Sequence, residues 1–301
     1  MQQYFENRKL TKVEDITIKT VGAGCKYENL LFANERIDKG WKSQNCHINN
    51  STFAKMGFKE SSFKGDDLRF NVFIDCYFKK TTFEDVKFNT CIFINCSFDE
   101  ATFVNCSFDY ARFEGGVIPY HAMYATLPGR ENIRWNLCKN LALESLKLGQ
   151  EDEYRRYFFE EKKASELYFW NKFWHKGDDP YYKKYNGAEQ VSGLIHFCLS
   201  KANKVLWGYG EKLTRLIFNI VIVWVAFAGA YYFGLPTLDE TSKISVQDAF
   251  YMSLSNFFTV TCDYTSTDFT YRILSVLEGG IGIVLMGFFG AALFRNINRR
   301  G

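Results

Sequence analysis

Apolar residues recur at every fifth position through much of the first half of the chain. Between residues 53 and 113 there are thirteen such positions without a gap, and twelve of them are phenylalanine: Phe53, Phe58, Phe63, Leu68, Phe73, Phe78, Phe83, Phe88, Phe93, Phe98, Phe103, Phe108 and Phe113. Ile48 and Ile118 extend this register, and most residues two positions earlier are small. A period of five fits neither an α-helix nor a flat strand. It predicts a square coil with one pentapeptide per side, whose large and small residues both point inward.

This pattern resembles that of the pentapeptide-repeat family. The resemblance implies a right-handed quadrilateral β-helix over residues 46–118, after an N-terminal cap over residues 1–45. Some members of that family mimic DNA with an acidic surface. Residues 46–118, however, carry ten acidic and eight basic side chains, and the two signs of charge are interspersed along the segment. We therefore expect no nucleic-acid partner. The solenoid is either a binding or sensing surface or a spacer, and the sequence does not identify a cytoplasmic ligand or protein partner.

Cysteines and charge exclude several kinds of function. Five of the nine cysteines lie at the small-residue positions of the repeat, so we interpret them as reduced thiols that fill the core. The sequence has no C-x-x-C motif and no close pair among its four histidines, so we predict no metal site. A net charge of +3 is too small to indicate nucleic-acid binding. With no nucleophile–base pair and no phosphate loop, we predict neither an enzyme nor a cofactor.

A helical hairpin is predicted over residues 119–187, where prolines end the repeat. Its first helix begins near Arg130 and carries an apolar stripe that Ser145 interrupts: Ile133, Leu137, Leu141 and Leu148. Gly149 is a suitable C-cap, and the acidic residues from Glu151 suit the start of a second helix towards Trp170. We expect the hairpin either to cover the open end of the solenoid or to bind a ligand, and we expect residues 175–187 to form a loop.

An amphipathic segment follows over residues 188–212. Apolar residues from Val191 to Leu199 are followed by Lys201 and Lys204, and Trp207 closes the segment. A basic amphipathic helix that ends in tryptophan suits a membrane surface. The other interpretation is a soluble helix packed on the linker.

Two long apolar runs lie near the C-terminus, over residues 216–235 and 273–294. Twenty helical residues span about 30 Å, the thickness of a bilayer's hydrocarbon core, so both runs predict transmembrane helices. Basic residues cluster before the first run and after the second, whereas five acids and two bases lie between them. The positive-inside rule then places both termini in the cytoplasm of a multi-pass protein of the cell (inner) membrane. Because the first ten residues are polar and charged, we expect no signal peptide there.

The segment between the two spans predicts a pore. Residues 246–258 form a third apolar segment that is too short to cross a bilayer, followed by a polar turn. The arrangement resembles the two-transmembrane potassium-channel superfamily, whose Thr-Val-Gly-Tyr-Gly filter begins where Thr259 and Val260 lie. Leu277-Glu278-Gly279 resembles the bacterial pentapeptide-repeat ion channels. The resemblance implies a homotetramer in the lipid bilayer, with a transmembrane pore domain over residues 213–301 and a re-entrant pore helix over residues 246–258.

The filter itself departs from the superfamily. Residues 259–264 are Thr-Val-Thr-Cys-Asp-Tyr, so both filter glycines are missing. Those glycines allow successive carbonyl groups to face one axis. We therefore predict a cation channel that passes potassium or sodium without strict preference. Its candidate pore residues are Thr259, Val260, Thr261, Cys262 and Asp263. The alternative function is a membrane-anchored scaffold or sensor with a non-conducting pore domain. Asp263 forms either an acidic ring or a local turn cap.

Two further features of the second span are candidate sites. Glu278 is an ionisable residue inside an apolar run, which is costly unless it faces protein or water. We expect it to be paired or functional beneath the filter, the alternative being a carboxylate that reaches the outer headgroups. The resemblance places an inner-helix hinge near Gly282, and Gly282 and Gly287 are the candidate gate or hinge residues. The alternative for these glycines is close helix packing.

Overall fold

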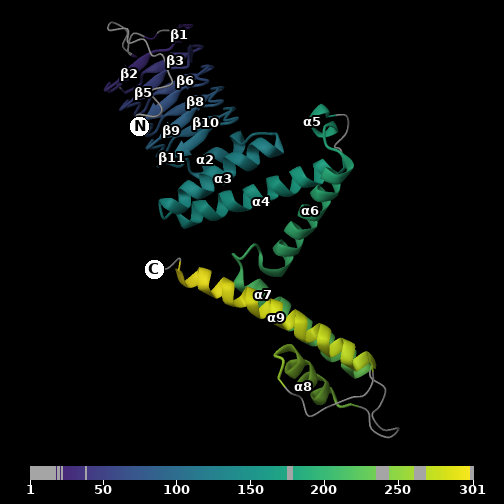
Figure 1. Ribbon diagram of the computed structural model, residues 1–301. Helices are drawn as coiled ribbons and strands as arrows, with labels where there is room; N and C mark the ends of the chain where they lie inside the picture. Colours follow the sequence, from purple (N-terminus) through teal and green to yellow (C-terminus); the bar gives the residue numbers. More distant parts are fainter. Residues whose placement is uncertain are drawn as a thin grey trace. The chain divides into compact units, whose positions relative to one another are not determined.

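The computed structural model describes residues 18, 21, 23–37, 39–174, 179–234, 244–260 and 269–298. The chain divides into two compact units, Met1–Leu194 and Ile195–Gly301 (Figure 1). The first unit contains the repeat and its helical hairpin, and the second contains the long apolar helices. Each unit is described separately.

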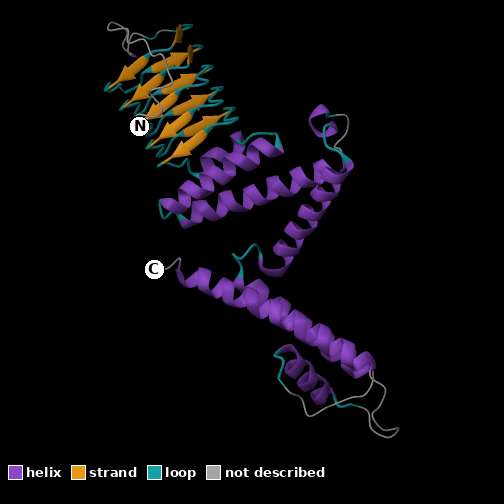
Figure 2. Cartoon of the chain, in the orientation of Figure 1, coloured by secondary structure: helices purple, strands orange, loops and turns teal. Residues whose placement is uncertain are grey.

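In the described part of the first unit, eleven strands of three residues each are stacked in parallel (Figure 2). The strands are β1 (Lys26–Glu28), β2 (Leu31–Ala33), β3 (Lys42–Gln44), β4 (His47–Asn49), β5 (Thr52–Ala54), β6 (Ser62–Lys64), β7 (Val72–Ile74), β8 (Thr82–Glu84), β9 (Ile92–Ile94), β10 (Thr102–Val104) and β11 (Arg112–Glu114). They form one face in the order β11-β9-β7-β5-β2 and another in the order β10-β8-β6-β3. The predicted pentapeptide-repeat β-solenoid is confirmed, with about four turns.

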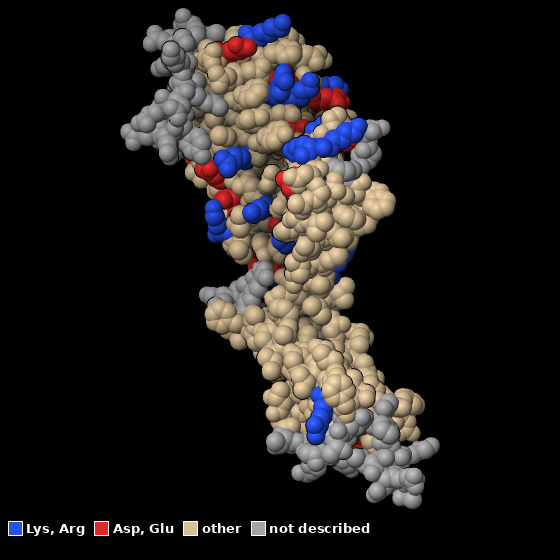
Figure 3. Space-filling model, turned by 45° about the vertical axis from the view of Figure 1, so that its right-hand side comes forward, with Lys and Arg blue, Asp and Glu red and all other residues tan. Residues whose placement is uncertain are grey.

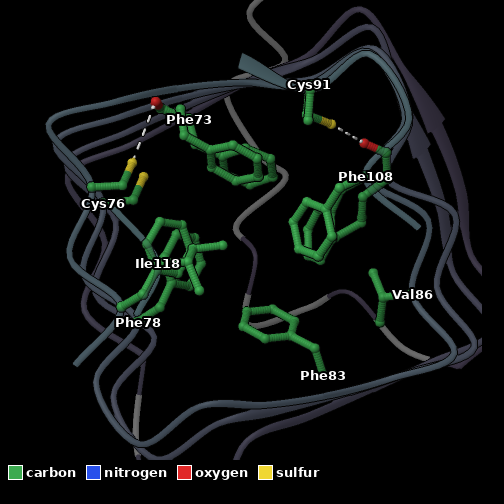
Figure 4. Close-up of a cluster of buried hydrophobic side chains, with 14 of the residues drawn as sticks. Phe73, Cys76, Phe78, Phe83, Val86, Cys91, Phe108 and Ile118 are labelled. Atoms are coloured by element: carbon green, nitrogen blue, oxygen red, sulfur yellow. Dashed lines mark hydrogen bonds between the residues drawn. The ribbon is translucent and has the colours of Figure 1, made fainter. Parts of the chain in front are cut away.

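Successive coils are in register at steps of twenty residues, which stacks equivalent phenylalanines. Phe53, Phe73, Phe93 and Phe113 lie opposite one another, with neighbouring ring centroids 4.8 to 4.9 Å apart and ring planes within 11°. Phenylalanines of adjacent sides meet edge to face, as between Phe83 and Phe88. Figure 4 shows the rings of Phe73, Phe78, Phe83 and Phe108 pointing inward from the sides of the coil. Parallel pairing brings equivalent residues of successive coils together, so stacked phenylalanines make up much of the core.

The small residues of the repeat lie beside the same core. Cys76, Cys91, Cys96 and Cys106 are buried, and each Sγ donates to the carbonyl oxygen of the residue 23 positions earlier, at 2.9 to 3.5 Å. Burial raises the pKa of Cys106 to about 11. That thiol is therefore protonated at neutral pH, which suits a core residue better than a nucleophile.

Each corner of the coil is made by one residue in the left-handed backbone region. Every fifth residue from Asn45 to Gly115 has a φ between +50° and +68°. Asparagine, aspartate and glycine tolerate this conformation, and they occupy many of the corners, whereas Phe70 and Tyr110 adopt it against their usual preference. The corners therefore use a second five-residue pattern, two positions after the phenylalanine pattern.

The solenoid begins before residue 46, the start that the sequence predicts. Strands β1 and β2 pair with β4 and β5 at a step of 21 residues, whereas β3 pairs with β6 at a step of 20. One extra residue between Ile37 and Lys42 thus shifts the first coil out of the five-residue register. That shift conceals the first coil from a search for strict periodicity.

Two neighbouring small-residue positions hold buried polar side chains, Asp66 and Asn71. Cys46 N–H donates to Asp66 Oδ1 at 2.8 Å, and Ser51 N–H donates to Asn71 Oδ1 at the same distance. The Asn71 amide also donates to two carbonyl oxygens, at 2.5 and 2.9 Å. An ionised carboxylate cannot donate, and burial raises the pKa of Asp66 above its usual value.

We expect Asp66→Asn to raise the free energy of unfolding by about 1 to 2 kcal/mol at neutral pH. The pKa of Asp66 is higher in the folded chain than in the unfolded chain. At a pH between these two pKa values, the folded state therefore binds more protons than the unfolded state. The stability contributed by Asp66 is therefore fully present at low pH and falls as pH rises through that interval. Urea unfolding at about pH 4 and pH 7 measures this fall, which the Asn variant lacks.

Asn71→Asp provides the matched control, because it places the same carboxylate at the next small-residue position. It should be less stable than the native chain and should acquire the same fall in stability with rising pH. Identical pH profiles for the native chain and Asp66→Asn would contradict the expectation.

The last coil is covered by a helical hairpin of α3 (Glu131–Lys147) and α4 (Glu151–Trp174), which follows α2 (Tyr120–Met123) and η2 (Tyr124–Thr126). Asn140 of α3 pairs with the exposed edge of β11, because its Oδ1 accepts from Phe113 N–H at 2.8 Å and its Nδ2 donates to Phe113 O at 3.0 Å. Glu144 accepts from Gly115 N–H at 2.9 Å. These side chains replace the hydrogen bonds that another coil would form, which protects the edge from pairing with other chains.

One detail of the predicted apolar stripe is wrong. Leu148 is 45% exposed, whereas Ser145 is buried and its hydroxyl donates to Leu141 O at 2.7 Å. Helix α3 ends at Lys147 and Gly149 adopts a φ of +70°. The chain therefore turns before Leu148 can reach the buried face.

Two helices follow the hairpin. Helix α5 (Pro180–Lys183) lies in the segment predicted as a loop, where Asp179 caps it by accepting from Tyr181 N–H at 2.9 Å. Helix α6 (Gly187–Trp207) matches the predicted amphipathic segment. Its side chains Val191, Ile195 and Leu199, spaced by one turn, are all more than half exposed. That apolar stripe suits the predicted position on a membrane surface.

The second unit contains α7 (Leu213–Gly234), α8 (Val246–Phe257) and α9 (Phe269–Asn298). Within α7 and α9, the segments Leu213–Phe233 and Phe269–Phe294 are long and apolar enough to cross a membrane. Most of their apolar side chains are exposed within the chain, unlike those of a soluble core. Figure 3 shows charged side chains gathered on the first unit, while the visible surface of the second is almost free of them.

Candidate functional site

The short helix α8 packs against both long helices, α7 and α9. It begins at a serine cap, where Ser245 Oγ accepts from Gln247 N–H at 3.3 Å, and Asp248 suits the positive end of the helix dipole. One face of α8 is buried, including Ala249, Met252 and Phe257. The amphipathic pattern of the sequence therefore places α8 between the two candidate spans.

A polar cluster joins the three helices at Glu278, which is fully buried. Its carboxyl group accepts from the Tyr231 hydroxyl of α7 at 2.7 Å and from the Ser253 hydroxyl of α8 at 2.5 Å. Asn256 Nδ2 donates to the Tyr231 hydroxyl at 3.0 Å. Ser253 Oγ also lies 3.1 Å from the carbonyl oxygen of Trp224. Each helix thus contributes at least one member of the cluster.

The surroundings of this cluster are apolar. Tyr231 packs in a core with Ala249, Met252 and Tyr271. A buried carboxyl group is costly unless hydrogen bonds satisfy it. The two hydroxyl groups meet that requirement for Glu278, so the cluster fixes α8 relative to α7 and α9. Within the described chain, Glu278 is buried and paired rather than exposed.

The glycines of α9 lie at different distances from α8. A Cβ atom at Gly282 would overlap the carbonyl oxygen of Phe257, and one at Gly279 would lie 3.3 Å from Asn256 O. Gly287 has open space around it. At Gly282 the local reason for glycine is therefore close packing on α8, and α9 continues as one helix through both Gly282 and Gly287.

The first two predicted filter residues form the C-terminal cap of α8. Thr259 N–H donates to Asn256 O at 3.1 Å and Val260 N–H donates to Ser255 O at 2.8 Å, which is a Schellman motif. Thr259 has a φ of +55°, an unusual conformation for a β-branched residue. The other filter residues Thr261, Cys262 and Asp263 lie outside the described part of the chain.

Asn219, the polar residue of the first apolar run, has a structural partner. Its Nδ2 donates to the carbonyl oxygens of Val205 and Leu206, at 2.9 and 2.8 Å, and Arg215 Nη1 donates to Lys204 O at 2.7 Å. These carbonyl groups belong to the last turn of α6, where Lys204 O also accepts from Gly208 N–H at 3.2 Å. Asn219 therefore connects the end of α6 to α7.

The sequence analysis did not predict three members of the cluster: Tyr231, Ser253 and Asn256. Ser253 and Asn256 lie three residues apart, on one face of a short apolar helix. Two polar residues on one face of this helix, together with an acid inside the second apolar run, are the sequence signal that could have indicated the cluster. Tyr231 offered none, because tyrosine is common near the ends of membrane spans.

Comparisons with known proteins add the following. No family model matches the chain, and no curated protein matches it. Among solved structures, a trypsin-treated variant of QnrB1, described as a plasmid-mediated fluoroquinolone resistance protein, is 21% identical over 31% of this chain and 49% of its own, with a TM-score of 0.21. Full-length QnrB1 is 21% identical over 30% of this chain and 47% of its own, with a TM-score of 0.20. The match thus spans about half the length of those chains.

Proposed function

We propose that this chain is one subunit of a homotetrameric cation channel, with its solenoid in the cytoplasm. The observation that carries the proposal is the buried Glu278, which holds a half-length helix between two helices of membrane-spanning length. A short helix fixed in this way positions the residues that follow its C-terminus. Those residues, 259–263, are the proposed pore lining. The proposal includes no catalytic activity and no cofactor other than permeant potassium or sodium.

Electrostatics favour cations at this place. The C-terminus of a helix carries a partial negative charge, and four copies of α8 around one axis would add these charges together. Asp263 lies shortly after the end of α8 in the sequence and would add a carboxylate per subunit. Without the filter glycines, a narrow ring of carbonyl groups is costly, so we propose a wider, partly hydrated pore.

The membrane and the other subunits account for the apolar surface of α7 and α9. A single subunit with two spans cannot enclose a pore, and exposed side chains such as Val276 and Phe233 need apolar surroundings. We propose that they face lipid and neighbouring subunits in the cell (inner) membrane. The apolar stripe of α6 would then lie at the cytoplasmic surface, which keeps both termini in the cytoplasm.

A second candidate function is a membrane-anchored scaffold or sensor with a non-conducting pore domain. It is favoured by the Schellman motif at the end of α8, which uses Thr259 and Val260 as a helix cap. Conduction would then require these two residues to leave that cap. Measurements of conductance separate the two functions.

We expect the purified chain to be a tetramer by native mass spectrometry and to conduct cations in planar bilayers. With potassium on one side and sodium on the other, the reversal potential should lie near zero, because the pore does not strip the ion's water shell. Asp263→Asn should reduce the preference for cations over anions, and Asp248→Asn, at the other end of α8, is the matched control. A monomer, no current, or a full potassium Nernst potential would each contradict the corresponding part of the proposal.

A further inference from the structure

One side of the solenoid is interrupted near its N-terminal end. On this side the outward residues Arg36, Gly57 and Tyr77 form a column joined by parallel bridges between coils. Because Gly57 has no side chain, the column contains a gap between Arg36 and Tyr77. A hollow of about 460 Å³ lies there. This volume falls in the range of small-molecule sites, roughly 300 to 1,000 Å³.

The rim of this hollow is strongly basic. Its lining includes Arg36, Lys39, Lys55 and Lys59 but only one acidic residue, Asp75. Asp75 Oδ1 accepts from Asn95 Nδ2 at 3.2 Å. With Glu60, which pairs with Lys39 and Lys59, four cations and two carboxylates still leave a local excess of positive charge, in a solenoid segment whose overall charge is close to balanced.

Several cations elsewhere on the solenoid pair with carboxylates. Lys64 Nζ lies 2.9 Å from Glu84 Oε1 of the next coil, and Arg69 Nη2 lies 2.7 Å from Asp67 Oδ2. At the hollow, Lys39 and Lys59 share a single acid, Glu60, at 3.5 and 3.7 Å. Among the described residues, no carboxylate oxygen lies within 4.0 Å of Lys55 Nζ. An anionic ligand would supply the missing charge.

The floor and wall of the hollow are apolar. Ile37 and Met56 lie at its base, and Tyr77, which is 39% exposed, forms one wall. A flat ring could lie on the Tyr77 side chain while the missing side chain of Gly57 gives it access to the floor. The hollow thus combines a site for negative charge with a site for an apolar ring.

We propose that this hollow binds a phosphorylated small molecule with a flat ring, of mononucleotide size. The phosphate would contact Lys55 and the neighbouring cations, and the ring would lie between Tyr77 and the gap at Gly57. The inference does not depend on channel activity. It would make the solenoid the sensing part of the chain.

The test is isothermal titration of AMP into the full-length chain in detergent. We expect saturable binding with a Kd below about 1 mM, weakening with salt because the cations are exposed. Adenosine and inorganic phosphate should each bind at least about tenfold more weakly, since each lacks one half of the ligand. Failure of AMP to bind, or equal binding by inorganic phosphate, would overturn the proposal.

Gly57→Leu is the decisive variant. A Cβ atom at Gly57 meets only ordinary contacts, the nearest at 3.7 Å to Arg36 Cγ, so the backbone accepts a side chain that fills the hollow. We expect this variant to lose AMP binding, and Lys55→Gln to weaken it about tenfold. Lys87→Gln, which removes an exposed cation on another side of the solenoid, should bind as the native chain does. Unchanged binding in both hollow variants would refute the site, and Lys55→Gln keeps the test valid if Gly57→Leu fails to fold.

Discussion

Phe83→Ala is expected to lower the free energy of unfolding of the solenoid by about 4 kcal/mol. Phe83 is fully buried and lies between Phe63 and Phe103, with both ring centroids 5.0 Å away. Its removal leaves a cavity and breaks two stacked pairs at once. Because each coil contacts only its neighbours, the effect should be strongest in the strands on either side. Hydrogen exchange of the β6, β8 and β10 amides in the full chain measures it directly.

Phe70→Ala is the matched control for this substitution. Phe70 belongs to the same repeat but lies at a corner, where it is 48% exposed and has a φ of +62°. Its truncation should change the free energy of unfolding by less than about 0.5 kcal/mol. If both variants lose the same stability, or if Phe83→Ala exchanges as the native chain does, stacking of the inward phenylalanines does not hold the coils together.

The solenoid could be predicted from the sequence because its core is one-dimensional. Parallel in-register pairing places each phenylalanine on its own equivalent, so the period of the sequence is the period of the structure. The same property explains where the prediction stopped. The extra residue between Ile37 and Lys42 keeps the inward positions Phe32 and Ile37 buried but shifts them by one in the count. The fold accommodates the extra residue at a corner of the coil, but a search for a strict five-residue period misses the coil that precedes it.

The membrane unit was less predictable, because its contacts depend on how helices cross. Composition was enough to recognise the two long apolar helices and the short one between them. It was also enough to single out Glu278, since a carboxyl group in an apolar run requires a partner. The partner residues could not be identified, because Tyr231 lies 47 positions away and reaches Glu278 only through the packing of α7 on α9.

Glu278→Leu is expected to have the largest effect in the second unit. The substitution removes the acceptor for two hydroxyl groups inside an apolar core. The Ser253 hydroxyl can donate instead to the carbonyl oxygen of Trp224, which is 3.1 Å away. Among the described residues, the Tyr231 hydroxyl donates to Glu278 and to no second acceptor. A buried group without its partner costs about 1 to 3 kcal/mol, so we expect a total loss of about 3 kcal/mol, measured as a lower unfolding temperature in detergent.

Glu278→Gln should be much milder than Glu278→Leu. The glutamine oxygen can accept from Tyr231, while its amide donates to Ser253, whose own proton then goes to Trp224 O. If the cluster also positions the pore residues, bilayer currents should follow the same order, with the Leu variant most impaired. Equal unfolding temperatures for the native chain and Glu278→Leu would contradict the structural role of the cluster.

The pairing of Glu278 with Tyr231 can be isolated by a double-mutant cycle. Tyr231→Phe removes the hydroxyl that donates to Glu278 but leaves the ring in its buried core. In the Glu278→Leu background this hydroxyl has already lost its acceptor, so its removal should cost less, and the two effects should fall short of their sum by about 1 to 2 kcal/mol. Tyr232→Phe is the control, because Tyr232 is 40% exposed next to the fully buried Tyr231. Additive effects for Tyr231→Phe and Glu278→Leu would show that the two residues act independently.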